Sequence, residues 1–134
     1  MPGPRQVVEQ LLAAINAHDL PACASLISDD ARLVAATGRV LDLGGMARLL
    51  ASTYRALPDA TVTVARWVVE GDIVVTEEVL EGTHEGTFAG LPASGRRLAI
   101  PMVHVTRVSD GRIVERVTYH DTAAVLRQLE DAVS

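Results

Sequence analysis

The chain has few of the residues and none of the long apolar stretches that mark several common protein classes. It contains one cysteine, Cys23, in 134 residues, which excludes an intrachain disulfide and leaves no zinc framework, because structural zinc sites need several closely spaced ligands. No stretch approaches the roughly 18 consecutive apolar residues of a membrane span, and no apolar block typical of a signal peptide follows the first residues. We therefore expect a cytoplasmic protein with no membrane partner.

The charge pattern and the motifs that are missing exclude further classes. The net charge is -5 and arginines are scattered along the chain, whereas nucleic-acid binders gather basic residues on one face, so we predict no nucleic-acid partner. There is neither a glycine-rich phosphate loop before a helix nor a serine nucleophile elbow. His18, His84 and His120 have no metal-site spacing with carboxylates. We predict no metal and no cofactor.

Aromatic residues make up only 3% of the chain, so any cavity must be shaped mainly by aliphatic side chains. The few rings, together with one methionine, are the candidates for contact with a substrate. The simpler reading of Tyr54, Tyr119 and Trp67 is a packing role, because a buried Tyr or Trp usually serves the core. The predicted substrate-binding residues are Tyr119, Trp67, Tyr54, Met102 and Phe88.

The first half of the chain has the apolar spacing of helices. With 49% hydrophobic residues in 134, the chain is long enough for one well-buried core, and we predict a single domain over residues 1–134. Apolar residues recur every three or four positions between Pro4 and Ala17, and Asp19 can cap a second helix with Pro21 in its first turn. The predicted elements are helices at 4–17 and 19–27, a short strand at 31–36, and a third helix that begins after Gly44-Gly45 and ends at 57–59.

The second half has the pattern of strands joined by short turns. Gly71-Asp72 and Asp110-Gly111 are hairpin connectors between runs rich in β-forming residues. The predicted strands are 61–69, 73–83, 97–108 and 112–120, followed by a closing helix at 122–132. Helices followed by a meandering antiparallel sheet indicate an α+β fold.

Alternation along the strands predicts which polar side chains face the helices. In the last strand, Val114, Arg116, Thr118 and His120 form the more polar set and are expected to point outward. The opposite set is Ile113, Glu115, Val117, Tyr119 and Asp121, and it is then expected to face the helices.

The two preceding strands each predict one inward polar residue. In the strand 97–108, Arg107 is expected to face solvent, so His104 faces inward together with Met102 and Thr106. In the strand 73–83, the face that carries Glu77 is expected to be the solvent face, so Glu78 points inward. An unpaired carboxylate in an apolar cavity has a raised pKa, and histidine changes protonation near neutral pH. Asp121, His104 and Glu78 are therefore the candidate acid and base groups. The simpler alternatives are a helix N-cap for Asp121, a hydrogen-bonded core side chain for His104 and a surface charge for Glu78.

Nearly the whole chain resembles the SnoaL-like family. The similarity is carried by the segment Gly82-Thr83-His84-Glu85-Gly86-Thr87-Phe88-Ala89-Gly90-Leu91-Pro92-Ala93-Ser94-Gly95-Arg96, by Val103-His104-Val105, by Asp110-Gly111-Arg112-Ile113-Val114-Glu115 and by residues 121–129. The resemblance implies the conical fold of the nuclear transport factor two superfamily, in which a strongly curved antiparallel sheet wraps N-terminal helices around an apolar pocket.

The resemblance also implies functional roles. In the cyclases of the family, which close rings in antibiotic pathways, an aspartate at the end of the last strand is the acid/base and a histidine on the preceding strand sits near it. These positions match Asp121 and His104. The favoured hypothesis is a cofactor-independent cyclase or related lyase/isomerase that acts on a hydrophobic, polyketide-like small molecule. A homodimer or larger homo-oligomer through the outer sheet face is implied in the same way, with Val103 and Val105 on that face.

Two other hypotheses remain open at this point. The first is an enzyme of the same fold that opens an epoxide, forms a cyclic ether or isomerises its substrate, with Glu78 and Asp121 as acid and base on one cavity wall. The second is a small-molecule-binding module without catalytic activity, because a fold does not determine a function.

Overall fold

A computed structural model describes residues 1–133, with side chains as far as Glu130. The chain opens with helix α1 (Pro4–Asn16), in which Pro4 occupies the first turn and the apolar face is buried. Helix α2 (Leu20–Ser25) follows, and the carboxylate of Asp19 caps it by accepting a hydrogen bond from the amide of Ala22. Both helices begin where local capping signals predicted them.

The first strand differs from its prediction in position and in pairing. Helix α2 ends at Ser25, and strand β1 already begins at Ile27 and runs to Val34 (Ile27–Val34). This strand pairs in parallel with the last strand, for example Val34 beside Val117, and antiparallel with the short strand β2 (Val40–Leu41). The predicted antiparallel meander of the second half is confirmed by the pairing of β3 to β6, whereas β1, which the prediction left unpaired, joins the sheet in parallel.

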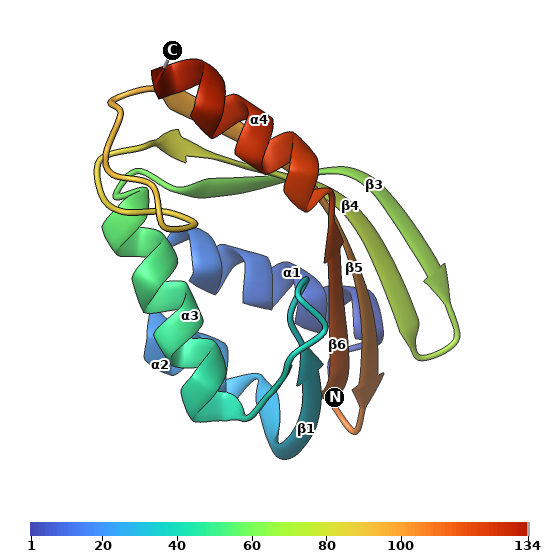
Figure 1. Cartoon of the computed structure of the whole chain (residues 1–134). Coiled ribbons are helices and arrows are strands. Elements are labelled where there is room, and N and C mark those ends of the chain that lie inside the picture. The colour runs from blue at the N-terminus through green and yellow to red at the C-terminus, as the bar shows by residue number, and fades with distance from the viewer. Residues whose placement is uncertain (134) are drawn as a thin grey trace.

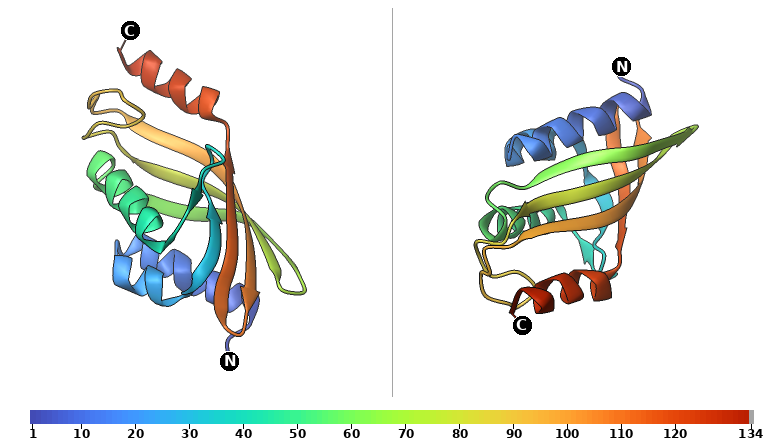
Figure 2. Two further views of the ribbon diagram at one scale, coloured as in Figure 1. Left: turned by 60° about the horizontal axis from the view of Figure 1, so that its bottom comes forward. Right: turned by 90° about the horizontal axis from the view of Figure 1, so that it is seen from above.

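The fold is α+β, with a strongly curved, mostly antiparallel sheet of six strands in the order β2-β1-β6-β5-β4-β3. Figure 1 shows that the sheet bends around helices α1 to α3, and Figure 2 shows the same curvature from two further sides. Helix α3 (Leu43–Ala56) is capped by Asp42. The remaining strands are β3 (Thr61–Glu70), β4 (Ile73–Thr83), β5 (Arg97–Ser109) and β6 (Arg112–His120).

Helix α4 (Thr122–Val133) packs across the end of β5, where β6 no longer covers it. The amide side chain of Gln128 bonds both backbone groups of Ala99, at 3.1 Å and 2.8 Å. Val125 and Leu129 are buried in the same place. Gln128 thus pairs with the backbone N–H and C=O of Ala99 at the part of the strand edge that β6 leaves unpaired. Within the described residues, none of the helices is both long and apolar enough to cross a membrane.

A β-bulge in β6 decides which of its side chains face the helices. Arg107 pairs with Glu115, but the next residue, Val108, pairs with Ile113, so Val114 is an extra residue on β6. Ile113 is fully buried before the bulge, and Arg116 is buried after it. Because one extra residue reverses the alternation, the inward set beyond the bulge becomes Arg116, Thr118 and His120.

Candidate functional site

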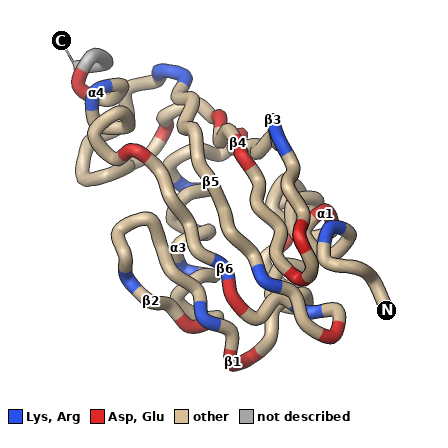
Figure 3. The backbone as a smooth tube through the Cα atoms, turned by 90° about the vertical axis from the view of Figure 1, so that its right-hand side faces the viewer, with Lys and Arg blue, Asp and Glu red and all other residues tan. Residues whose placement is uncertain are grey.

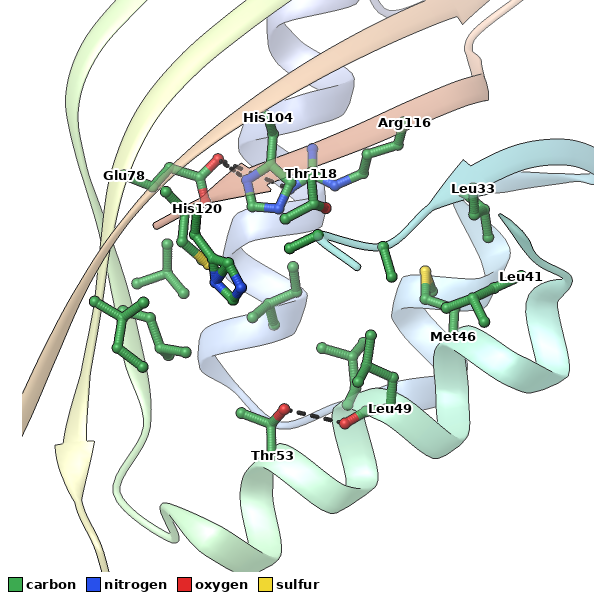
Figure 4. Close-up of a pocket in the computed structure, with 18 of the residues that line it drawn as sticks. Leu33, Leu41, Met46, Leu49, Thr53, Glu78, His104, Arg116, Thr118 and His120 are labelled. Atoms are coloured by element: carbon green, nitrogen blue, oxygen red, sulfur yellow. Dashed lines mark hydrogen bonds and ion pairs between the residues drawn. The ribbon is translucent and has the colours of Figure 1, made fainter. Parts of the chain in front are cut away.

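The concave side of the sheet encloses a cavity of about 270 Å³. Most of its wall is aliphatic and comes from α1, β1, β2 and α3, with Leu33, Leu41, Met46 and Leu49 among the side chains shown in Figure 4. The opposite wall is formed by β4, β5 and β6. The cavity lies between the two buried apolar clusters of the molecule, one around α1 and one around the end of α3 and α4.

One wall of the cavity carries a polar patch on three neighbouring strands. The register places its members in adjacent rows, because Thr76 lies beside His104 and Thr118, and Glu78 lies beside Met102 and His120. We define the polar patch as Thr76, Glu78, His104, Thr106, Arg116, Thr118 and His120. Figure 4 shows the labelled members grouped on one side of the cavity, facing the apolar residues of α3.

Glu78 is the acceptor at the centre of the patch. The residue is only 2% exposed. Its Oε2 atom accepts a hydrogen bond from the hydroxyl of Thr76 and another, at 2.9 Å, from Nδ1 of His104. Nη2 of Arg116 lies 3.8 Å from the same oxygen. Burial alone would raise the pKa of Glu78, but the hydrogen bonds from His104 and Thr76 and the charge of Arg116 outweigh it, so the pKa is lowered. Glu78 is therefore an ionised carboxylate.

The bond to Glu78 fixes the tautomer of His104. An ionised carboxylate can only accept, so Nδ1 of His104 carries the hydrogen and Nε2 is left with a free lone pair. Burial lowers the pKa of His104, and the charge of Arg116 lowers it further, while Glu78 opposes the shift only in part. At neutral pH the ring is thus a neutral imidazole. Nε2 has no hydrogen-bond partner among the described residues, and His104 lines the cavity.

Arg116 supplies the positive charge that balances Glu78. It is 7% exposed, and its Nη1 donates a 2.7 Å hydrogen bond to the hydroxyl of Thr106. Burial lowers the pKa of the guanidinium and Glu78 opposes the shift, yet an arginine keeps its proton in a protein. The cation of Arg116 and the anion of Glu78 therefore lie together in the patch, with the neutral ring of His104 beside Glu78.

The predicted site residues divide between the cavity and the outer face. Glu78 and His104 point inward, as their alternation predicted. Tyr54, Met102 and Phe88 line the cavity. The hydroxyl of Tyr54 donates to the backbone carbonyl of Ile15 at 2.8 Å, and burial raises its pKa to about 12.

Three placements made from the sequence are wrong. Tyr119 is 58% exposed, and Asp121 is exposed too, where its carboxylate accepts a hydrogen bond from the amide of Ala124 and so caps α4. Both border a shallow hollow on the outer face of the sheet. Asp121 therefore lies outside the cavity that His104 and the carboxylate of Glu78 face. Trp67 does not line the cavity, and the guanidinium of Arg5 lies 4.5 Å from its ring centre. It packs against the core cluster around α1, which agrees with its alternative reading as a packing residue.

Sequence reasoning missed Arg116, Thr118 and His120, which all line the cavity. The expected alternation in β6 started from Ile113, which does point inward, and ran through Val114 without a break. The bulge at Val114 is visible only in the pairing of β6 with β5. The sequence contains no clear sign of this reversal. The opposite set includes Val117 and the aromatic Tyr119, and such residues fit a buried inner face and a covered outer face equally well.

A curved sheet folded over helices, around a cavity with aliphatic walls and one polar patch, defines a class of small α+β proteins with a buried pocket. Within that class, the chain belongs to the SnoaL-like polyketide cyclase family, whose family model matches residues 5–129.

Similar proteins agree with this assignment. An aklanonic acid methyl ester cyclase of Streptomyces peucetius is 36% identical over 76 residues, which are 57% of this chain and 52% of the relative. The chain thus matches about half the length of that curated relative. A candidate polyketide cyclase from Streptomyces antibioticus has a crystal structure with a TM-score of 0.85 and 35% identity over 95% of this chain and 98% of its own. A candidate hydroxylase from Streptomyces galilaeus superposes with a TM-score of 0.86 at 24% identity, over 96% of each chain, and shows the fold alone.

Proposed function

We propose that the protein is a cofactor-independent cyclase that closes a ring by aldol chemistry in a hydrophobic, polyketide-like intermediate, with His104 as the base. The observation that carries the proposal is the Glu78–His104 pair, in which the carboxylate holds Nδ1 at 2.9 Å and leaves Nε2 free at an apolar cavity. The family assignment and the name of the Streptomyces peucetius relative support the substrate class.

The proposed reaction begins with proton transfer to His104. Nε2 takes a proton from a carbon flanked by carbonyl groups, and the electrons of the broken C–H bond pass to a carbonyl oxygen to form an enolate. The enolate carbon then attacks a second carbonyl carbon, forming a C–C bond, and that carbonyl oxygen becomes an alkoxide that must gain a proton. No cofactor is required, because the substrate's own carbonyl accepts the electrons.

Glu78 and Arg116 position and tune the base in this proposal. Glu78 orients the imidazole and stabilises the imidazolium that forms when Nε2 takes the proton, as a buried carboxylate does for a catalytic histidine. Arg116 keeps Glu78 ionised, since its charge lies 3.8 Å from the carboxylate. The aliphatic walls exclude water, which strengthens both interactions.

The proposed function is tested with aklanonic acid methyl ester, the compound in the relative's name, as the first substrate. Ring closure without loss of water gives a product of unchanged mass and new chromatographic mobility. We expect H104Q to lower turnover by about 10²-fold or more, the usual contribution of a general base. The matched control is R107Q, on the outer face of the same strand, where Arg107 is exposed. If H104Q folds normally and turns the substrate over at the wild-type rate, His104 is not the base.

A second candidate function is a small-molecule carrier without catalytic activity. The observation that favours it is that Glu78 already has three partners within the protein, in Thr76, His104 and Arg116. A carrier would bind the ester in the cavity and release it unchanged. An acid and base pair of Glu78 and Asp121 is not proposed, because Asp121 lies outside the cavity.

Three sequence expectations stay predictions. A homodimer through the outer face would cover Val103 and Val105, which are only partly buried there. Figure 3, seen from the side of β5 and β6, shows a long uncharged stretch of β5 between charged residues near its two ends. A cytoplasmic location and a single domain over the whole chain are likewise predictions.

A further inference from the structure

His120 is the one member of the polar patch whose ring nitrogens have no assigned partner. Its Nδ1 atom is buried and makes no hydrogen bond within the described part of the chain, and no hydrogen bond of its Nε2 is found there either. A buried polar atom without a partner costs about 1–3 kcal/mol, so native structures keep few of them and each needs a reason. The fold itself gives none, because a phenylalanine would fill the same space without losing a bond.

The position of His120 suggests the reason. It lines the same cavity as His104 and sits on the adjacent strand, one row further along, since Met102 pairs with His120 and His104 pairs with Thr118. The two rings are close enough for a charge on His120 to affect His104. Figure 4 shows both rings on the polar wall, extending into the cavity.

The other titratable groups of the cavity are already committed. His104 is fixed as an acceptor at Nε2 by its bond to Glu78, and Arg116 does not release its proton. The hydroxyl of Tyr54 donates to the carbonyl of Ile15, and its pKa is raised to about 12 by burial. Among the described cavity residues, His120 is thus the titratable group that can both present an N–H to a ligand and release that proton.

We propose that His120 is the acid of the ring closure and donates a proton to the alkoxide oxygen that forms when the enolate carbon attacks the second carbonyl. This inference rests on the proposed function. The O–H bond forms as the N–H bond of the His120 imidazolium breaks, while His104 has taken one proton from carbon. One proton is removed and one is delivered, so transfer from His104 to His120 through water after product release restores both rings.

The experiment separates the two proton transfers. In D₂O, the base step alone exchanges the acidic C–H of aklanonic acid methyl ester for deuterium, which mass spectrometry of the recovered substrate measures, and chromatography measures ring closure. We expect H120F to lower closure by about 10²-fold while exchange stays within about threefold of wild type. H120Q keeps a hydrogen-bond donor and should recover about tenfold of that loss. E115Q, on the outer face of the same strand, is the matched control, and thermal melting checks that each variant is folded.

Each outcome decides the proposal. If H120F closes the ring at the wild-type rate, His120 is not the acid. If closure and exchange fall together in folded H120F, His120 acts in substrate binding or in the first proton transfer, and the assignment is overturned. If the wild-type protein neither exchanges nor cyclises the ester, the proposed function fails and the role of His120 fails with it, whereas exchange without any effect of H120F overturns the role of His120 alone.

Discussion

The two faces of strands β4 to β6 carry similar charged residues in very different surroundings. On the outer face the ion pairs are exposed, as in Arg66 with Glu77 at 3.6 Å and Arg107 with Asp72 at 3.4 Å. On the inner face Glu78 and Arg116 are buried and share their hydrogen bonds with a histidine and two threonines. Outer pairs of this kind contribute little to stability, whereas the inner charges depend on one another.

This difference shows why the inner face is a functional candidate. A buried ion pair is often no more stabilising than well-packed apolar side chains of the same size. A cavity wall that keeps Glu78, His104 and Arg116 therefore retains groups that stability does not require. Chemistry on a ligand is a reason to retain them.

The largest expected effect comes from breaking the inner charge pair. We expect E78Q to lower the free energy of unfolding by about 3–5 kcal/mol, because it leaves the buried Arg116 without its anion. The matched variant E77Q changes the adjacent residue on the outer face, where the Arg66 pair is exposed, and should cost about 0–1 kcal/mol. Urea unfolding followed by circular dichroism measures both. Equal losses in the two variants would contradict the contrast between the faces.

The sequence predictions were correct where the signal is local and wrong where it depends on long-range pairing. The starts of α1 and α2 and the inward direction of Glu78 were predictable, because Pro4, Asp19 and the alternation around Glu78 act within a few residues. The burial of Arg116 was not, because it depends on a bulge that exists only through pairing with β5. Arg116 belongs to the more polar set of its strand, which is typical of a surface position. Its partner Glu78 lies 38 residues earlier in the chain.

The candidate site was predictable in its central pair and in the cavity lining by Tyr54, Met102 and Phe88. His104 and Glu78 were placed correctly, each from the residues beside it in its own strand. Alternation in the last strand also selected Asp121, and the family resemblance agreed with that choice, although the position of Asp121 in the sequence fits the N-cap role it has in the structure. His120, one residue earlier, was assigned to the wrong face by the same alternation that misplaced Asp121.

Acidification should weaken the inner face before the outer one. The folded pKa of His104 is lowered from 6.5, so the unfolded chain binds this proton more tightly, and the stability from the neutral ring is lost as pH falls from about 6.5 through the folded pKa. Glu78 has a lowered pKa too, and its contribution is lost in a lower window, below about 4.5. The charged or titratable neighbours that face His104 are Glu78, Arg116 and His120.

We therefore expect the unfolding free energy of the wild-type protein to fall between pH 7 and pH 5, and H104Q to have a smaller slope over that range. Urea titrations at several pH values measure the slopes. R107Q, on the outer face of β5, should keep the wild-type slope. An H104Q slope equal to that of the wild-type protein would mean that His104 has the same pKa in the folded and unfolded chains.

Substitutions at Asp121, between strand β6 and helix α4, are expected to have the smallest effect on stability and turnover. Its carboxylate accepts one hydrogen bond, 3.0 Å from the amide of Ala124, and approaches Arg127 at 4.0 Å on the exposed side. Because asparagine caps a helix about as well as aspartate, we expect D121N to be within a few tenths of a kcal/mol of the wild-type protein and D121A to lose about 1 kcal/mol. Both should keep turnover within about twofold, since the side chain lies outside the cavity. A folded D121N with turnover reduced tenfold or more would instead move the acid/base role from the inner face to Asp121.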